Sequence, residues 1–380
     1  MKRWLFAVLT LAIGTLVVIN PRAGAQDGGE PRDFLMGFTP FPWAISFEAI
    51  NDVYAKIATD ADLIVHHFDN GVPWPEALAG TDFHPSVLVD WNWRRSNTPE
   101  DHQILLTVTP ISFARDGLAA YRGENEDMPL PTPWDSYAFD HPDVIQAFTR
   151  YCEDIIAYFE PDYFMMGIEV NLLMKLRPDR WDAYMVLHRA VYAALKTAHP
   201  DLPVFVSLTG IDLLPGYTEA DQAAQRQALA DVETFTDLVA FSIYPYMTGY
   251  MTNAIPGAIY DELAELTDKP MAVSETGYPA QSFRIDVGGG VIAPLDGTPE
   301  KQAEWIALTL EKAQEYDFEF VVNFVSRDYD DLWRAIGARE DLTIAWRDTG
   351  LYAEDGAFRP SLAIWREWLA RPLVDEDLNR

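Results

Sequence analysis

Two glutamates stand near the ends of apolar stretches that are otherwise typical of buried β-strands. The stretch Tyr163 to Asn171, YFMMGIEVN, is almost wholly apolar and carries Glu169 near its C-terminal end. Lys269 to Pro279, KPMAVSETGYP, repeats the pattern with Glu275. A lone carboxylate is costly to bury, so each glutamate needs a partner or a task. Two carboxylates delivered by two barrel strands to the same end are what hydrolysis of a glycosidic bond requires.

The surroundings of the two glutamates predict different roles for them. Retaining hydrolysis needs one protonated and one ionised carboxyl group, about 5–5.5 Å apart. Ile168 and Val170 flank Glu169 and favour its neutral form, whereas Glu275 has hydroxyl donors nearby, Tyr244 among them, that favour its charged form. We therefore predict that Glu169 is the acid/base and Glu275 the nucleophile. A structural salt bridge inside a barrel is the alternative for either residue.

The elements that must position these glutamates alternate between strand and helix. Strands are expected at 34–43, 62–68, 103–109, 163–171, 203–208, 238–246, 269–279 and 318–326, and helices at 46–59, 141–159, 181–197, 219–235, 258–266, 300–316 and 361–370. Regular alternation implies parallel pairing, and eight units favour an α/β fold of the closed (β/α)8 TIM barrel type in a single domain. The segment 75–100 fits the pattern least well. The loop 110–140 is long enough to be functional or mobile.

The composition is that of a globular protein and disfavours some partners. Of the 380 residues, 49% are hydrophobic and 13% aromatic, and the net charge is −31. This charge argues against nucleic acid or an anionic membrane as a partner. Aromatic rings stack on sugar faces, although core packing accounts for most of them. The one cysteine, Cys152, cannot form an internal disulfide.

The N-terminus resembles a secretory signal peptide. Lys2 and Arg3 precede an apolar run from Trp4 to Asn20, and Ala23-Gly24-Ala25 forms a small-residue cleavage site. An uncleaved anchor helix is the alternative. We expect a secreted or periplasmic protein with no stable membrane association after cleavage. The predicted boundaries are 1–25 for the signal peptide, 26–33 for a linker, 34–371 for the barrel and 372–380 for a C-terminal tail.

The motifs at the strand ends resemble those of the clan A glycoside hydrolases. SETGYP at 274–279 is similar to the strand-seven motif of endo-β-galactanases and plant-type endo-β-glucanases. IYPYM at 243–247 is similar to their strand-six motif, whose tyrosine commonly holds the nucleophile. The resemblance implies a retaining (β/α)8 enzyme, with the acid/base Glu169 ending strand four and the nucleophile Glu275 ending strand seven.

Two positions depart from the clan pattern. The clan usually has Asn directly before the acid/base, where this chain has Ile168, and Asn171 instead follows two residues after Glu169. Strand alternation predicts that Asn171 and Glu169 share a face. The clan arginine on strand two is also not evident, and His66 and His67 stand in that region. Because adjacent strand residues point to opposite faces, these histidines cannot share one metal ion.

Side chains that follow the strand ends are the predicted carbohydrate contacts. They are Trp43, His67, Asp69, Trp74, Asn171, Tyr244, Tyr246, Tyr278, Asn323 and Trp333. At least two of Trp43, Trp74, Tyr246, Tyr278 and Trp333 are expected to be stacking platforms for sugar rings. No metal site and no cofactor is predicted, and the acidic stretch DYDDLW at 328–333 is expected to be a solvated loop rather than a calcium site.

The sequence therefore predicts a secreted or periplasmic glycoside hydrolase that cleaves β-linked polysaccharide or oligosaccharide with retention. The alternative is a non-catalytic carbohydrate-binding protein on the same TIM-barrel scaffold. A metal-dependent hydrolase would need histidine and aspartate ligands on several strands, and only the second strand offers them.

Overall fold

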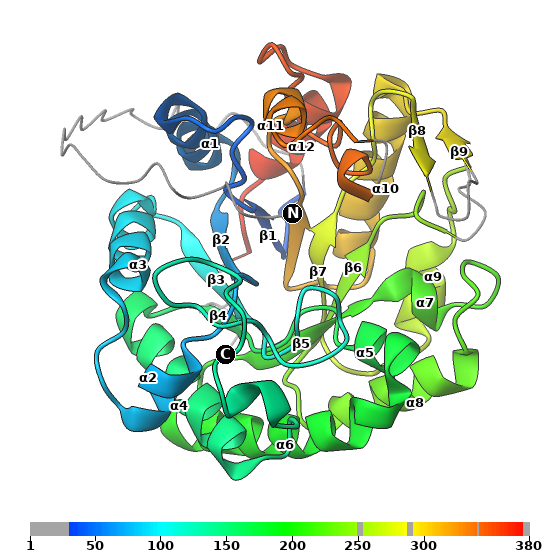
Figure 1. Ribbon diagram of the computed structural model, residues 1–380. Coiled ribbons are helices and arrows are strands. Elements are labelled where there is room, and N and C mark those ends of the chain that lie inside the picture. The colour runs from blue at the N-terminus through cyan, green and yellow to red at the C-terminus, as the bar shows by residue number, and fades with distance from the viewer. Residues whose placement is uncertain (1–29, 249–253, 287–291, 340–341, 375–380) are drawn as a thin grey trace.

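The chain forms a closed barrel of eight parallel strands surrounded by helices, which confirms the predicted single-domain (β/α)8 TIM barrel (Figure 1). The computed structural model describes residues 30–248, 254–286, 292–339 and 342–374. The barrel strands are β1 (Leu35–Phe38), β2 (Leu63–Phe68), β3 (Gln103–Val108), β4 (Tyr163–Met165), β5 (Val204–Thr209), β6 (Val239–Ile243), β7 (Met271–Thr276) and β10 (Phe320–Asn323). Strand β10 pairs with both β1 and β7, which closes the ring.

The helices lie outside the barrel, as Figure 1 shows. They are α1 (Phe47–Asp60), α2 (Trp74–Ala79), α3 (Pro85–Asn97), α4 (Pro142–Phe159), α5 (Asn171–Leu176), α6 (Trp181–Ala198), α7 (Gly210–Leu213), α8 (Gln222–Glu233), α9 (Ile259–Ala264), α10 (Pro299–Glu315), α11 (Asp330–Ala335) and α12 (Pro360–Leu369). None of the helices in the described segments is long and apolar enough to cross a membrane.

Local sequence signals set the starts of several helices. The hydroxyl of Ser46 accepts a hydrogen bond from the backbone N–H of Ala49 at 3.1 Å, so Ser46 caps α1. Helix α10 begins with Pro299 after Thr298, whose hydroxyl accepts from the N–H of Lys301. Proline suits this first position because the N–H it lacks would have no partner within the helix.

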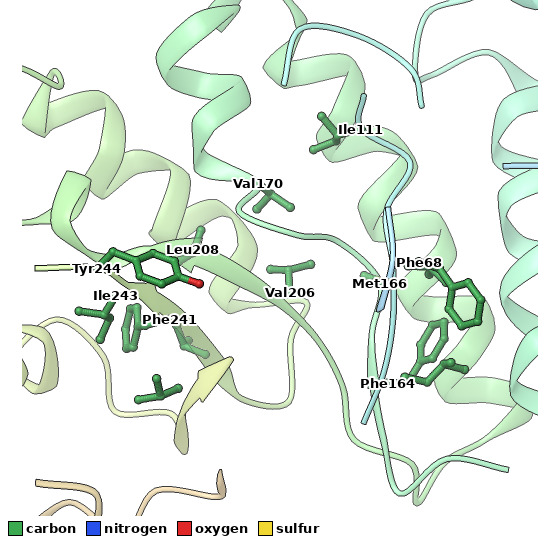
Figure 2. Close-up of a cluster of buried hydrophobic side chains, with 14 of the residues drawn as sticks. Phe68, Ile111, Phe164, Met166, Val170, Val206, Leu208, Phe241, Ile243 and Tyr244 are labelled. Atoms are coloured by element: carbon green, nitrogen blue, oxygen red, sulfur yellow. The ribbon is translucent and has the colours of Figure 1, made fainter. Parts of the chain in front are cut away.

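Strand alternation divides the apolar side chains into two cores. The inner core fills the barrel and consists of Leu35, Leu63, Val65, Leu105, Met165, Ile168, Phe205, Leu238, Ala240, Ala272, Phe320 and Val322. The larger core lies between the strands and the helices. Figure 2 shows part of it, where Phe164, Val206 and Phe241 come from three successive strands. Because the inner core is packed with side chains, the barrel offers its end, rather than its interior, to a ligand.

The fourth strand is shorter than the sequence predicts. Regular strand structure ends at Met165, and the chain then turns before α5 begins at Asn171. The prediction of one strand from Tyr163 to Asn171 is therefore wrong. The end of the strand cannot be read from the apolar pattern, because residues beyond it are still buried. Ile168 packs in the inner core and Val170 in the outer core.

Two other regions are more ordered than the sequence indicates. The segment 75–100 carries α2 and α3. After β7, the chain forms the antiparallel hairpin of β8 (Phe283–Asp286) and β9 (Ile292–Leu295), which the sequence does not reveal. The glycines 288–290 between these strands lie outside the described residues.

The acidic stretch after β10 is a buried ion network, and the prediction of a solvated loop is wrong. Asp328 and Asp348 are 1% and 0% exposed. Arg359 donates to Oδ1 of Asp328 at 3.0 Å, and Arg347 donates to Oδ2 of Asp348 at 2.7 Å. Burial raises the pKa of Asp328, although Arg359 opposes this rise. Because each arginine offsets the charge of a buried aspartate, this network fixes the loop after β10.

The first and last described segments lie side by side. The N–H of Arg32 donates to the carbonyl of Pro372, and the N–H of Val374 donates to the carbonyl of Arg32, at 2.9 and 2.8 Å. The Arg32 side chain forms an ion pair with Asp62. Residues 1–25, where the signal peptide is predicted, lie outside the described residues.

Replacement of Arg359 by Met should destabilise the fold strongly. The change leaves the Asp328 carboxylate buried without its cation, and an uncompensated buried charge costs about 3–5 kcal/mol. The free energy of unfolding from urea titration at pH 7 measures the loss, which should shrink at lower pH as Asp328 takes up a proton. Arg334→Met, in a pair that is half exposed, is the control and should change little. Equal losses for the two variants would contradict the role given to this network.

Candidate active site

A β-bulge in β7 directs Glu275 into the mouth of the barrel. Phe241 of β6 pairs with Val273, but the next residue, Ser242, pairs with Glu275, so Ser274 is an extra residue in β7. Ser242 shares the inward face of Ala240, which belongs to the inner core, so its partner Glu275 also faces inward. Without the bulge, alternation would turn Glu275 toward the helices. Bulges beside active sites commonly re-aim a side chain in this way.

An irregular turn after β4 positions Glu169. Its backbone has φ of +48°, in the left-handed region, and its N–H donates to the hydroxyl of Ser207 at 2.9 Å. The N–H of Val170 donates to the carbonyl of Ser207, also at 2.9 Å. A Cβ on Gly167 would lie 2.7 Å from Val170, so only glycine fits at the start of this turn. The backbone of β5 therefore holds the turn that presents Glu169.

Glu275 lies among side chains from β2 and β6. The hydroxyl of Tyr244 donates to its Oε2 at 3.1 Å, and Nδ1 of His67 lies 3.6 Å from its Oε1. The other ring nitrogen of His67 lies 3.9 Å from Asp69. These contacts bring together Glu275 and three of the predicted carbohydrate contacts. His67 takes the place beside the candidate nucleophile that the clan arginine was expected to occupy.

Burial raises the pKa of Glu275 to about 7. The positive charge of His67 opposes the rise, the negative charge of Glu169 adds to it, and the Tyr244 hydrogen bond opposes it. The expectation that hydroxyl donors keep Glu275 ionised is therefore not met in the free protein, because burial outweighs them. The influence of Glu169 shows that the two carboxylates share one electrostatic environment.

The pKa of His67 is raised even though burial lowers it, because Asp69 and Glu275 stabilise the imidazolium. His66, the neighbouring residue, faces the helices instead. Its ring bonds to the hydroxyl of Thr98 at 2.8 Å, and burial holds its pKa well below the usual value. The two histidines thus point to opposite faces, as predicted.

Glu169 is paired with a cation that sequence reasoning missed. Nη2 of Arg115 donates to its Oε2 at 3.2 Å, and the hydroxyl of Thr209 lies 3.4 Å from its Oε1. Arg115 belongs to the long segment after β3. The length of this segment indicated a function, but nothing in the sequence indicated which of its residues would reach a strand end.

The structure places five of the predicted carbohydrate contacts outside the reach of a ligand. Trp74, Asn171, Tyr246, Tyr278 and Asn323 are each 0% exposed. The amide of Asn171 bonds to the backbone of Thr209 and to Gln225, so it secures α5 rather than sharing the face of Glu169. Trp74 donates to the carbonyl of Ala119 and stacks on Trp134. These residues build the scaffold, and their prediction as sugar contacts has no support in the structure.

Trp43 and Trp333 are partly exposed and remain candidate stacking platforms. Each carries an arginine against its ring, with Arg327 4.0 Å from the ring centre of Trp43 and Arg347 4.7 Å from that of Trp333. Three further partly exposed aromatic residues, which the sequence analysis did not single out, are Phe41, Phe324 and Trp346. The ring of Trp346 lies edge-on to that of Tyr244, with 5.7 Å between the ring centres. Trp346 therefore contacts the residue whose hydroxyl donates to Glu275.

Within the described residues, one group of acidic side chains has the spacing of a metal site, namely Asp328, Asp330 and Asp348. Arg347 and Arg359 already supply the positive charge there. The two glutamates instead each have a cation beside the carboxylate, Arg115 for Glu169 and His67 for Glu275.

Solved structures of glycoside hydrolases share this fold, although no family model and no curated protein matches the chain. GH5_18 from Bifidobacterium longum subsp. longum is 16% identical, with a TM-score of 0.60 over 90% of this chain and 81% of that chain. The GH53 catalytic domain of Ignisphaera aggregans is 17% identical, with a TM-score of 0.56 over 93% and 99%.

The exo-β-1,4-mannosidase Op5Man5 from Opitutaceae bacterium strain TAV5 is 13% identical, with a TM-score of 0.60 over 92% of this chain and 62% of that chain. These three proteins belong to clan A of the glycoside hydrolases, so the resemblance predicted from the strand-end motifs is confirmed at the level of the fold. At such low identity the likeness carries no residue roles, which rest on the geometry of the site.

Glu275→Gln should stabilise the protein above pH 7 and leave it unchanged below about pH 4.5. Between these values the folded protein binds a proton at Glu275 that the unfolded chain releases, so the stability of the wild type falls as pH rises. Glutamine mimics the protonated form and should gain on the order of 2 kcal/mol at pH 8. Urea unfolding from pH 4 to 8 measures the difference, with Glu311→Gln as an exposed control. A difference that does not vary with pH would contradict the raised pKa.

Proposed function

We propose that this protein is a glycoside hydrolase that cleaves β-linked oligosaccharide or polysaccharide with retention. The observation that carries the proposal is the pair of carboxylates at the mouth of the barrel, Glu169 after β4 and Glu275 on β7, where the charge of Glu169 acts on Glu275. Each lies beside a cation, Arg115 or His67, and Tyr244 donates to Glu275. Retaining hydrolysis uses two such carboxyl groups.

In the proposed reaction Glu169 gives its proton to the leaving oxygen while Glu275 attacks the anomeric carbon. Water then hydrolyses the glycosyl ester on Glu275, and Glu169 takes up the proton of that water. Tyr244 holds Oε2 of Glu275, which leaves Oε1 on the side of His67. Because the pKa of Glu275 is about 7 in the free protein, the reaction starts from the fraction in which Glu275 is ionised.

The similar structures suggest where a search for the substrate should begin. One is named an exo-β-1,4-mannosidase, and a GH5_18 structure from Streptomyces cattleya holds GlcNAc. We therefore place β-mannosides and β-linked glycans that contain GlcNAc first in a panel, followed by β-galactans and β-glucans, which the strand-end motifs indicate.

A non-catalytic carbohydrate-binding protein is the second candidate. The raised pKa of Glu275 favours the neutral form of the residue that would have to attack as the nucleophile. The proposed first step needs this residue ionised. A protein that only binds sugar has no such requirement.

Glu275→Ala should lose activity on every substrate, because the nucleophile is required whatever the leaving group. Added azide should restore some turnover and give the product of inverted configuration. Glu169→Ala should retain activity on aryl glycosides with acidic phenols and lose roughly 10²–10⁴-fold on unactivated glycans. Initial rates on both substrate types, after the panel has identified a substrate, measure these effects.

Glu311→Ala, on the exposed side of α10, is the matched control and should behave as the wild type. If Glu275→Ala retained activity on aryl glycosides and Glu169→Ala lost it, the two roles would be reversed. Binding of a glycan by calorimetry without turnover of any β-glycoside would favour the second candidate.

We also propose that the protein is exported, on the basis of the basic start, the apolar run and the small residues Ala23-Gly24-Ala25. Cleavage is expected between Ala25 and Gln26. N-terminal sequencing of the full chain recovered from a secreting bacterial host tests this proposal. A chain that still begins at Met1 and remains with the membrane would indicate the uncleaved anchor instead.

A further inference from the structure

The chain after β3 folds back in a tight hairpin that reaches Glu169. The hairpin consists of residues 110–119. The N–H of Ser112 donates to the carbonyl of Gly117 at 2.8 Å, and the N–H of Ala119 donates to the carbonyl of Pro110 at 2.7 Å. Ile111 pairs with Leu118. These backbone bonds close the hairpin, and the indole of Trp74 holds its end by donating to the carbonyl of Ala119.

Arg115 lies at the tip and is 7% exposed, which is unusual for an arginine. Its backbone has φ of +55°, a left-handed conformation that costs energy for any residue with a Cβ. The N–H of Arg115 and its Nη1 both donate to the carbonyl of Ser112, while Nη2 reaches Glu169. The hairpin thus maintains a strained backbone and a buried cation where they meet the candidate acid/base.

The same hairpin exposes a large aromatic ring. Phe113 is 58% exposed, and the guanidinium carbon of Arg115 lies 5.9 Å from the centre of its ring. Arg115 therefore joins an exposed aromatic surface to the carboxyl group that meets the leaving oxygen in the proposed reaction. Exposed aromatic rings beside a polar site are suited to stacking against the apolar face of a sugar.

We propose that the hairpin 110–119 forms the leaving-group side of the active site, where Arg115 positions Glu169 and Phe113 contacts the departing sugar. This inference rests on the proposed function and specifies which part of the substrate the hairpin recognises.

The chemistry of the first step gives Arg115 a defined effect. The proton of Glu169 moves to the glycosidic oxygen, the bond from the anomeric carbon to that oxygen breaks, and Glu275 forms the new ester bond. Glu169 becomes a carboxylate as the proton leaves, and Arg115 stabilises this developing charge. Leaving groups that need the proton therefore depend on Arg115, and leaving groups that depart without it do not.

The test for Arg115 compares Arg115→Met, Arg115→Lys and the wild type on a series of aryl glycosides whose phenols differ in acidity. For Arg115→Met, kcat/KM should fall by roughly 100-fold on the least acidic phenol and change little on the most acidic one. Arg115→Lys should recover part of the loss. Arg189→Met, which removes an exposed arginine from α6, is the control and should follow the wild type.

The test for Phe113 uses the size of the leaving group. Phe113→Ala should lower kcat/KM roughly 10-fold on an oligosaccharide, because it removes the ring against which the departing sugar would stack. It should leave the glycosyl fluoride of the same sugar unchanged, because fluoride is too small to reach the ring. Phe358→Ala, which removes another exposed ring, is the matched control.

The outcomes separate this inference from the function on which it rests. If Arg115→Met slowed all aryl glycosides and the fluoride equally, Arg115 would have only a structural role. If Phe113→Ala lost equal activity on the oligosaccharide and on the glycosyl fluoride, contact between Phe113 and the departing sugar would be excluded. Thermal unfolding of each variant checks that it folds. If Arg115→Met does not fold, Arg115→Lys is compared with the wild type instead. A wild type that turns over no glycoside would overturn the proposed function and the inference together.

Discussion

The burial of two carboxylates at one end of a barrel is the constraint on which this site depends. Glu169 and Glu275 are each about one-fifth exposed, and the negative charge of Glu169 raises the cost of charging Glu275. One cation lies beside each carboxylate and offsets its negative charge. His67 from β2 lies beside Glu275, and Arg115 from the hairpin after β3 lies beside Glu169. Burial outweighs these favourable contacts and raises the pKa of Glu275 to about 7, and the negative charge of Glu169 adds to the rise.

Departures from regular strand structure give both glutamates their directions. The barrel brings the ends of β4 and β7 to one face, but alternation alone would not aim the side chains. The extra residue Ser274 turns Glu275 inward, and the turn at Gly167 with the left-handed Glu169 gives the other carboxyl group its place. Both devices are backbone features that β6 and β5 secure by hydrogen bonds.

The site has two sides of different chemistry. The cation His67 lies on β2, and Arg115 comes from the chain after β3. The partly exposed aromatic rings come from the chain after β1 and β10 and are Phe41, Trp43, Phe324, Trp333 and Trp346. The buried network of Asp328 with Arg359 fixes the segment after β10, which carries Phe324, Trp333 and Trp346.

The sequence by itself determined the barrel and the identity of the two glutamates, since eight apolar strand patterns with intervening helices leave few other folds, and a carboxylate in an apolar strand stands out against its neighbours. It misplaced the contacts around them. Trp74, Tyr246 and Tyr278 follow strand ends as expected, yet the surrounding helices and loops bury them completely. Arg115 lies 54 positions from Glu169 along the chain, in a segment with no periodic pattern. Only the tertiary structure decided which of these side chains are buried and which lie beside the two glutamates. Burial and long-range pairing depend on how distant segments pack, and local residue patterns do not record that.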